Sequence, residues 1–125
     1  MVVETLAKLK ERGLKMTVAS SRMSVSLNAF INDMGIKDYI SYVLGADNVA
    51  KAKPNPEPVL KTLRDLGASA QQTLVIGDMP VDIEMGRNAG AATCAVTWGN
   101  ATPEALAASG ADFIINSMPE LLEIV

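Results

Sequence analysis

The sequence contains no histidine, so the side chain that most often serves as a catalytic base is absent from this chain. Serine nucleophiles activated by histidine and histidine-ligated metal sites are excluded with it. Chemistry in these 125 residues must therefore depend on carboxylates, lysines and hydroxyl groups. A serine activated by lysine stays an open alternative, because that arrangement needs no histidine.

Cysteine and long apolar runs are also scarce. Cys94 is the single cysteine, so no disulfide can form within the chain, and its place in the apolar run TCAVTW predicts a small buried side chain. No run approaches the roughly 18 apolar residues of a membrane span, and no apolar signal segment is apparent. These features favour a cytoplasmic protein.

Neither positive nor negative charge is concentrated in one part of the chain. The formal net charge is −3 and the 11 Lys and Arg residues are scattered, so no basic surface for nucleic acid or an anionic membrane is predicted. Only 4% of the residues are aromatic, whereas 49% are hydrophobic, so Ala, Val, Leu and Ile must form the core. This length and composition are typical of one globular domain.

Helical patterns alternate along the chain with short apolar runs that end in turn residues. This alternation predicts a mainly parallel sheet covered by helices on both faces, a Rossmann-like three-layer α/β sandwich. Glycines are expected to end the first three helices, Ser24 to cap the second, and Asn55 to cap the third, with Pro56 as its first helical residue. We predict helices at 2–12, 24–34, 55–67, 80–90, 103–110 and 119–125, and strands at 15–21, 41–47, 73–78, 93–98 and 112–116.

Two aspartates follow the third predicted strand. Asp78 is the last residue of TLVIGD, and Asp82 lies in the first turn of the next helix. A helix N-terminus favours anions, and Mg²⁺ commonly uses one or two carboxylates together with water and substrate phosphate. The alternative is that Asp78 only caps the helix and that Asp82 is a solvated acid of its first turn.

Lys53 precedes Pro54 in the segment KAKPNPEP, which disfavours helical backbone at the lysine and gives its side chain a defined direction. An ammonium group held in this way can neutralise a phosphate. A solvated surface lysine is the alternative, and Lys51 has the same alternative without a proline to position it.

Ser20 and Ser21 end the first predicted strand and precede a helix. Hydroxyl and backbone N–H groups at such a junction can bind phosphate oxygens. The alternative is that the two serines only start the helix. Because the carboxyl ends of parallel strands share one edge of a sheet, we expect the serine hydroxyl, the lysine and the paired acids to converge.

On these residues the chain resembles the haloacid dehalogenase superfamily, and within it phosphatases of the phosphoglycolate phosphatase type. Ser20 matches the second motif of that family, Lys53 in KPNPEP matches the third, and Asp78 with Asp82 in GDMPVD match the fourth. The segments RNAGA and VTWG are similar to the same branch.

The resemblance implies a Mg²⁺-dependent phosphomonoesterase that acts on a small phosphorylated metabolite through an aspartyl-phosphate intermediate. It implies that Ser20 and Lys53 are catalytic residues that bind the phosphoryl group, with Ser21 beside them. It also implies that Asp78 and Asp82 form the Mg²⁺ site.

One part of the family pattern is missing. The first motif, an Asp-x-Asp followed by Gly-Thr on the first strand, does not occur in these residues, and the helical cap that follows it is absent too. The resemblance therefore implies that residues 1–125 form one partial core domain, the carboxyl-terminal part of such an enzyme. In the family the missing strand lies between KMTVAS and TLVIGD, so we expect either that these two strands pair directly into a five-stranded sheet or that another chain completes it.

Because the missing motif supplies the nucleophile, we expect the chain alone to be inactive. A different hypothesis is a non-catalytic domain that binds phosphate or Mg²⁺, or that self-associates through exposed sheet edges. An unrelated receiver-like or nucleotide-binding sheet also fits the alternation. It lacks the acidic cluster on a first strand and the glycine-rich phosphate loop that those folds need.

Overall fold

The computed structural model describes residues 2–125, which divide into two compact units. The first unit is the chain up to Ala50 together with Met118–Val125, and the second unit is Lys51–Ser117. A single partial core domain without a cap stays a prediction. The elements, in chain order, are α1 (Val2–Glu11), β1 (Met16–Ala19), α2 (Ser24–Asp33), η1 (Lys37–Tyr39), β2 (Ile40–Leu44), η2 (Ala46–Asn48), α3 (Glu57–Leu66), η3 (Ala70–Gln72), β3 (Leu74–Gly77), α4 (Pro80–Asn88), β4 (Ala92–Val96), α5 (Pro103–Ala108), β5 (Phe113–Ile115), η4 (Met118–Glu120) and α6 (Leu121–Ile124).

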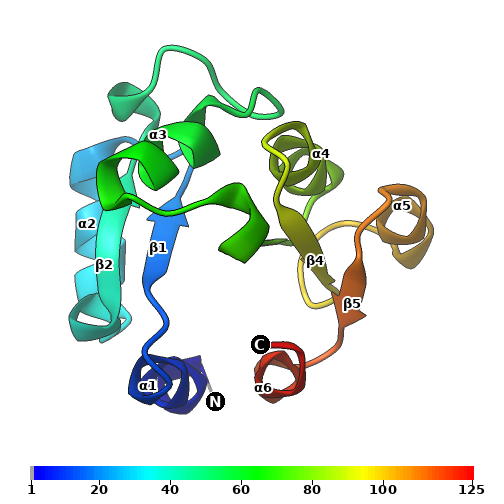
Figure 1. Ribbon diagram of the computed structural model, residues 1–125, viewed down its shortest axis with the longest axis horizontal. Helices are drawn as coiled ribbons and strands as arrows, with labels where there is room; N and C mark the ends of the chain where they lie inside the picture. The colour runs from blue at the N-terminus through cyan, green and yellow to red at the C-terminus, as the bar shows by residue number, and fades with distance from the viewer. Residues whose placement is uncertain (1) are drawn as a thin grey trace. The chain divides into compact units, whose positions relative to one another are not determined.

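The first unit is built on the parallel pair of strands β1 and β2 (Figure 1). Ala19 at the end of β1 is in register with Leu44 at the end of β2, so the two carboxyl ends are level. Helix α1 contacts α6 and buries Leu6 and Leu9. Gly13 follows α1 with a φ of 85°, a left-handed conformation that glycine adopts without steric cost, so the predicted helix end is confirmed.

Helix α2 buries only part of the face that its apolar spacing predicts. Leu27 and Ile31 are 2% and 3% exposed, whereas Phe30 and Met34 are 41% and 46% exposed. Residues four apart lie above one another on a helix, so the buried part of α2 is one narrow stripe.

Helix α3 is the first helix of the second unit, and it begins one residue later than predicted. It begins at Glu57, with Pro56 at the cap and not at the first helical position. The Asn55 side chain still accepts a hydrogen bond from the Glu57 N–H at 2.9 Å, so it satisfies a free donor at the start of the helix. Gly67 ends the helix with a φ of 66°, as predicted.

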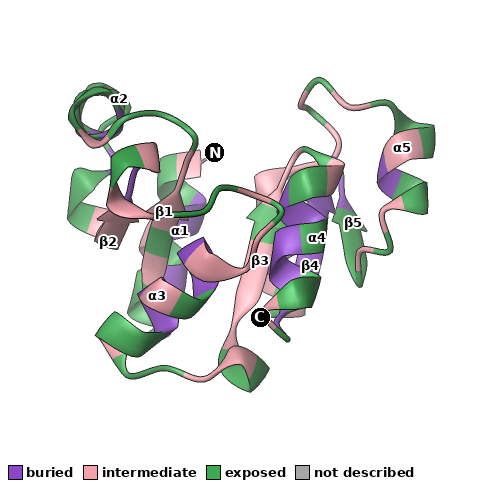
Figure 2. Cartoon of the chain, turned by 90° about the horizontal axis from the view of Figure 1, so that it is seen from above, coloured by how far each residue is buried: buried purple, intermediate pink, exposed green. Residues whose placement is uncertain are grey.

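The sheet of the second unit has the order β3-β4-β5, and all its pairs are parallel. Cys94 in the central strand is 0% exposed, which confirms its prediction as a buried side chain. Helix α4 packs on β3 and β4 with its buried residues on one face (Figure 2). Gly86 permits this contact, because a Cβ at that position would lie 2.7 Å from the Thr93 Cγ2 atom.

The core of the second unit is aliphatic, as the composition predicts. One cluster joins α4, β4 and α5, and another joins α3 to α4. Their buried members are Ile83, Ala95 and Leu106 in the first cluster, and Val59, Leu63 and Met85 in the second. These contacts fix α4, and therefore the turn that precedes it, against the end of β3.

Among residues 2–125, β1 pairs with β2 in the first unit, and β3, β4 and β5 pair in that order in the second unit. Because β1 and β3 belong to different units, their direct pairing and the completion of the sheet by another chain both stay predictions. Over residues 2–125, none of the helices has both the length and the apolar character needed to cross a membrane.

Candidate active site

The turn between β3 and α4 carries both predicted acids. Pro80 is the first residue of α4 and Met79 occupies the cap position, so the alternative that Asp78 caps the helix is wrong. The Asp82 N–H donates to the Met79 carbonyl oxygen at 3.0 Å, and the Met79 N–H donates to Asp82 Oδ2 at 3.2 Å. These reciprocal bonds close the turn and hold the Asp82 carboxylate at the start of the helix.

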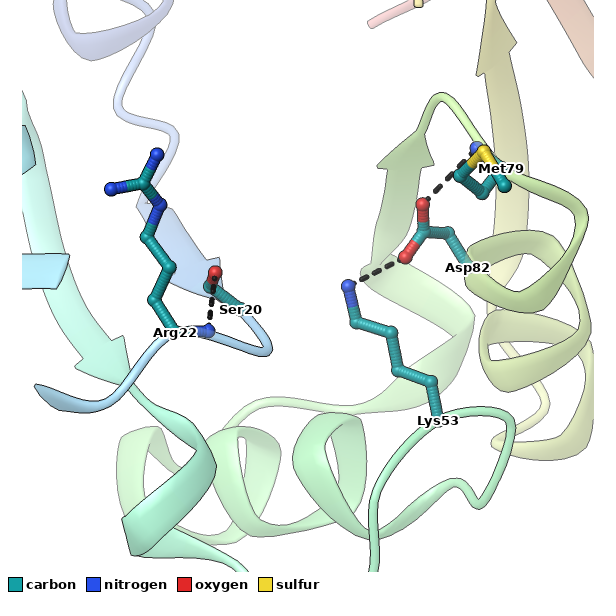
Figure 3. A network of polar contacts seen from close by, with 5 residues as sticks. All are labelled: Ser20, Arg22, Lys53, Met79 and Asp82. Atoms are coloured by element: carbon teal, nitrogen blue, oxygen red, sulfur yellow. Dashed lines mark hydrogen bonds and ion pairs between the residues drawn. The ribbon is translucent and has the colours of Figure 1, made fainter. Parts of the chain in front are cut away.

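Lys53 forms an ion pair with Asp82, with 2.6 Å between Lys53 Nζ and Asp82 Oδ1. In Figure 3 the ammonium group points to one carboxylate oxygen while the Met79 N–H points to the other. The side chains of Lys53 and Asp82 are only 20% and 10% exposed. The alternatives of a solvated lysine and a solvated first-turn acid are therefore both wrong, because a charge this buried requires a partner.

The loop that carries Lys53 is fixed at several points. The Asn88 side chain donates to the Pro54 carbonyl oxygen at 3.1 Å, which ties the loop to the last turn of α4. The Lys51 N–H donates to Glu57 Oε2 at 2.7 Å, although Lys51 is an exposed residue. Helix α4 thus contacts Lys53 at its start and the residue after Lys53 at its end.

Asp78 is partly buried, and its carboxylate has no hydrogen bond or ion pair with any residue of the 2–125 range. Gly99, which follows β4, packs against it so closely that a Cβ at Gly99 would overlap the Asp78 side chain. Gly77 has the same relation to Asp82. Sequence reasoning missed both glycines, although each lies beside a quoted motif, in GDMPVD and in VTWG.

The donor set fits one Mg²⁺ ion at Asp78. This carboxylate is free to accept a cation, and Mg²⁺ commonly takes one or two protein carboxylates and completes its shell with water and phosphate. Asp82 is less available, because each of its oxygens already accepts a hydrogen bond or pairs with Lys53. Among residues 2–125 no group of three or more acidic or cysteine side chains could hold a metal ion by itself.

Ser20 and Ser21 lie in the first unit, in the loop from β1 to α2. Ser20 Oγ accepts a hydrogen bond from the Arg22 N–H at 3.1 Å, and its own N–H donates to the Leu44 carbonyl oxygen at 3.0 Å. Ser21 is exposed. Because α2 begins at Ser24, the alternative that the two serines start the helix is wrong.

Asp47 is a residue of this loop region that sequence reasoning assigned to a strand. Strand β2 ends at Leu44, and Asp47 lies in the short helix η2. Its carboxylate accepts hydrogen bonds from the Ser24 hydroxyl and the Ser24 N–H, both at 2.6 Å, and these bonds lower the pKa of Asp47 below its ordinary value. Ser24 therefore donates to a charged acceptor. The prediction that Ser24 caps α2 is wrong, because Met23 occupies the cap position.

The structure thus brings together Lys53, Asp82 and the turn that carries Asp78, all in the second unit. Ser20 and Ser21 belong to the first unit, so their convergence with Lys53 stays a prediction.

Comparison with known proteins gives the same family as these motifs. The family model described as haloacid dehalogenase-like hydrolase matches residues 1–96. The chain is 40% identical over 121 residues to "Probable phosphatase IndB" of Dickeya dadantii, covering 97% of this chain and 53% of that protein. It is 32% identical over 124 residues to pyrophosphatase PpaX of Halalkalibacterium halodurans, covering 99% of this chain and 58% of that protein.

A solved structure is similar over the same range. The crystal structure described as a predicted phosphoglycolate phosphatase from Haemophilus somnus superposes with a TM-score of 0.92 at 28% identity, covering 97% of this chain and 54% of that one. The chain spans about half the length of the curated relatives it matches. The chain therefore belongs to the haloacid dehalogenase-like hydrolase family.

Proposed function

We propose that this chain is part of a Mg²⁺-dependent phosphatase that hydrolyses a small phosphorylated metabolite. The observation that carries the proposal is the ion pair of Lys53 with buried Asp82 beside the unpartnered carboxylate of Asp78. Phosphoryl transfer depends mainly on positioning and charge neutralisation. The Lys53 loop supplies a held ammonium group, and the turn between β3 and α4 supplies a free carboxylate. The relatives named above are a probable phosphatase, a pyrophosphatase and a predicted phosphoglycolate phosphatase, so the substrate is proposed only as a phosphate ester or pyrophosphate.

Each residue has a defined part in this proposal. Asp78 holds Mg²⁺, which when bound would neutralise charge on the phosphate oxygens. Lys53 neutralises the transferring group as a point charge, and Asp82 keeps Lys53 in place while its other oxygen closes the turn. Ser20, with Ser21 beside it, donates hydrogen bonds to phosphate oxygens.

Binding of Mg²⁺ and phosphate by the chain tests these roles. Inorganic phosphate with Mg²⁺ is expected to raise the midpoint of thermal unfolding, because ligands that bind only the folded state stabilise it. Asp78→Asn should remove the Mg²⁺ response, whereas Glu84→Gln, which replaces an exposed acid of α4, should keep it. A chain whose unfolding midpoint ignores both ligands contradicts the proposal.

The joint action of Ser20 and Lys53 needs its own test, because the two residues come from different units. Ser20→Ala and Lys53→Met should each weaken phosphate binding, and the double variant should lose less than the sum of the two single losses in free energy. Additive losses would mean that the residues act at independent places.

We further propose that the 125-residue chain has no turnover by itself, because no residue in it takes the place of the Asp-x-Asp nucleophile. Purified chain with Mg²⁺ should release no phosphate from a generic aryl phosphate. Turnover that disappears in the Asp78→Asn variant would refute this part of the proposal while supporting the site.

A second candidate function is self-association, and the strand edges favour it. Within residues 2–125, β1 is paired only with β2, and β3 is paired only with β4. Unpaired edges are templates for pairing with another chain. Light scattering over a concentration series should show dimers, and Ile76→Lys, which charges an exposed position of β3, should return the chain to monomers. A wild-type chain that is monomeric at all concentrations excludes this function.

A further inference from the structure

Asp47 lies outside every motif that the family resemblance uses, yet its carboxylate accepts two short side-chain hydrogen bonds in the first unit. Its Oδ1 accepts from the Ser24 N–H and its Oδ2 from the Ser24 hydroxyl, each at 2.6 Å. A carboxylate held by two donors of one residue has a fixed orientation, and charged acceptors make stronger hydrogen bonds than neutral ones. Asp47 therefore joins η2, after β2, to the first residue of α2.

Backbone contacts between the same two segments agree with this connection. The Ala46 N–H donates to the Arg22 carbonyl oxygen at 2.7 Å, and the Ser20 N–H donates to the Leu44 carbonyl oxygen at 3.0 Å. Gly45 lies between these contacts, and a Cβ there would lie 2.8 Å from Ser24 Cα and 2.9 Å from the Arg22 oxygen. The segment at the end of β2 thus fixes the backbone conformation of the loop that follows β1, through these hydrogen bonds and close contacts.

The conformation of this loop determines which hydrogen bonds the Ser20 hydroxyl makes. The Arg22 N–H donates to Ser20 Oγ at 3.1 Å, so the serine oxygen is used as an acceptor inside the loop (Figure 3). Its O–H proton has no acceptor among the described residues and is free to be donated to a ligand. The position of the Arg22 amide depends on the loop conformation, which is held at Arg22 O by Ala46 and at Ser24 by Asp47.

We propose that Asp47 is a positioning residue for Ser20: by fixing Ser24 it holds the loop of residues 20–24 in the conformation that leaves the Ser20 hydroxyl as a hydrogen-bond donor. The inference rests on the proposed function, in which Ser20 binds a phosphate oxygen. A plain alternative is that Asp47 only stabilises the start of α2. The two differ in whether the loss of Asp47 changes Ser20 in molecules that stay folded.

The experiment compares Asp47→Ala, Asp47→Asn and the control Asp33→Ala, all well below their unfolding midpoints. Asp33 is an exposed acid at the end of α2 in the same unit. Asp33→Ala removes one negative charge, as Asp47→Ala does. The measurements are amide hydrogen exchange of residues 20–24 and 46, and the Kd of inorganic phosphate in the presence of Mg²⁺. Asn keeps an acceptor for the Ser24 N–H and can donate to the Ser24 hydroxyl, so it serves as the conservative rescue.

We expect Asp47→Ala to speed exchange at the Arg22 and Ala46 amides by about fivefold or more, because the loop opens locally. Its phosphate Kd should rise about threefold to tenfold, because the hydrogen bond from a displaced Ser20 hydroxyl is weakened and not lost outright. Asp47→Asn should stay within about twofold of the wild-type Kd, and Asp33→Ala should change neither measurement.

The outcomes separate the two claims. Asp47→Ala with wild-type exchange in the loop, or with faster exchange and an unchanged phosphate Kd, overturns the positioning role. If the unaltered chain does not bind phosphate, the proposed function fails instead. The exchange pattern of the Asp47→Ala loop then decides by itself whether Asp47 positions the segment that carries Ser20.

Discussion

Replacing Lys53 with methionine leaves the buried Asp82 carboxylate without its ion-pair partner. The charges are 2.6 Å apart, which at an effective dielectric constant of about 20 corresponds to roughly 6 kcal/mol of attraction before desolvation is subtracted. Because the two side chains keep 20% and 10% exposure, solvent screens part of this attraction, and desolvation of both groups offsets more of it. We expect a net coupling of about 1–3 kcal/mol.

The assay is a double-mutant cycle with Lys53→Met, Asp82→Asn and the double variant, measured by urea unfolding. With a slope of about 2 kcal/mol per molar urea, Lys53→Met should lower the unfolding midpoint by about 0.5–1.5 M. The double variant should recover part of the loss, because it removes both charges at once. Lys51→Met and Glu84→Gln, two exposed positions in the same unit, serve as the matched pair and should be additive.

A coupling free energy below about 0.5 kcal/mol between Lys53 and Asp82 would refute this reasoning. The Lys53 side chain would then be held by the rest of its loop, and Asp82 would matter only for closing the turn before α4 through Met79.

The remaining predictions concern packing and pH. Gly99→Ala should destabilise the chain by about 1–3 kcal/mol in urea unfolding, and should weaken Mg²⁺ binding by calorimetry, because the new Cβ overlaps Asp78. Ile83→Ala, at a position 0% exposed, should cost about 2–5 kcal/mol in the same unfolding assay. Because the pKa of Asp47 is depressed from 3.8, its stabilisation is present above about pH 4 and lost as pH falls through its folded-state pKa, so Asp47→Asn should be less stable than wild type only at the higher pH.

Each of these has a contrary result. Unchanged Mg²⁺ affinity in Gly99→Ala would show that Asp78 tolerates displacement. A loss below about 1 kcal/mol in Ile83→Ala would show that the site collapses around the smaller side chain. A stability difference between wild type and Asp47→Asn that persists below the folded-state pKa of Asp47 would show that the hydrogen bonds to Ser24 do not depend on the charge of Asp47.

Local sequence alone was enough to identify the elements and the acids that follow β3. Helix ends at Gly13 and Gly67 were predictable because a left-handed residue at that place is favourable only for glycine. The buried Cys94 was predictable because it lies in a short run of mainly apolar residues. The motif residues Lys53 and Asp82 could be found from their sequence context, but nothing local indicated that they pair with each other.

Tertiary structure decided the features that depend on segments distant in sequence. The Lys53–Asp82 ion pair joins residues 29 positions apart, and Asp47 reaches Ser24 across 23 positions. Burial of a charge makes its partner obligatory, but only packing determines which charges are buried. The neighbours of each strand were equally invisible in the sequence, because an apolar run predicts a strand but does not indicate which other strand it pairs with.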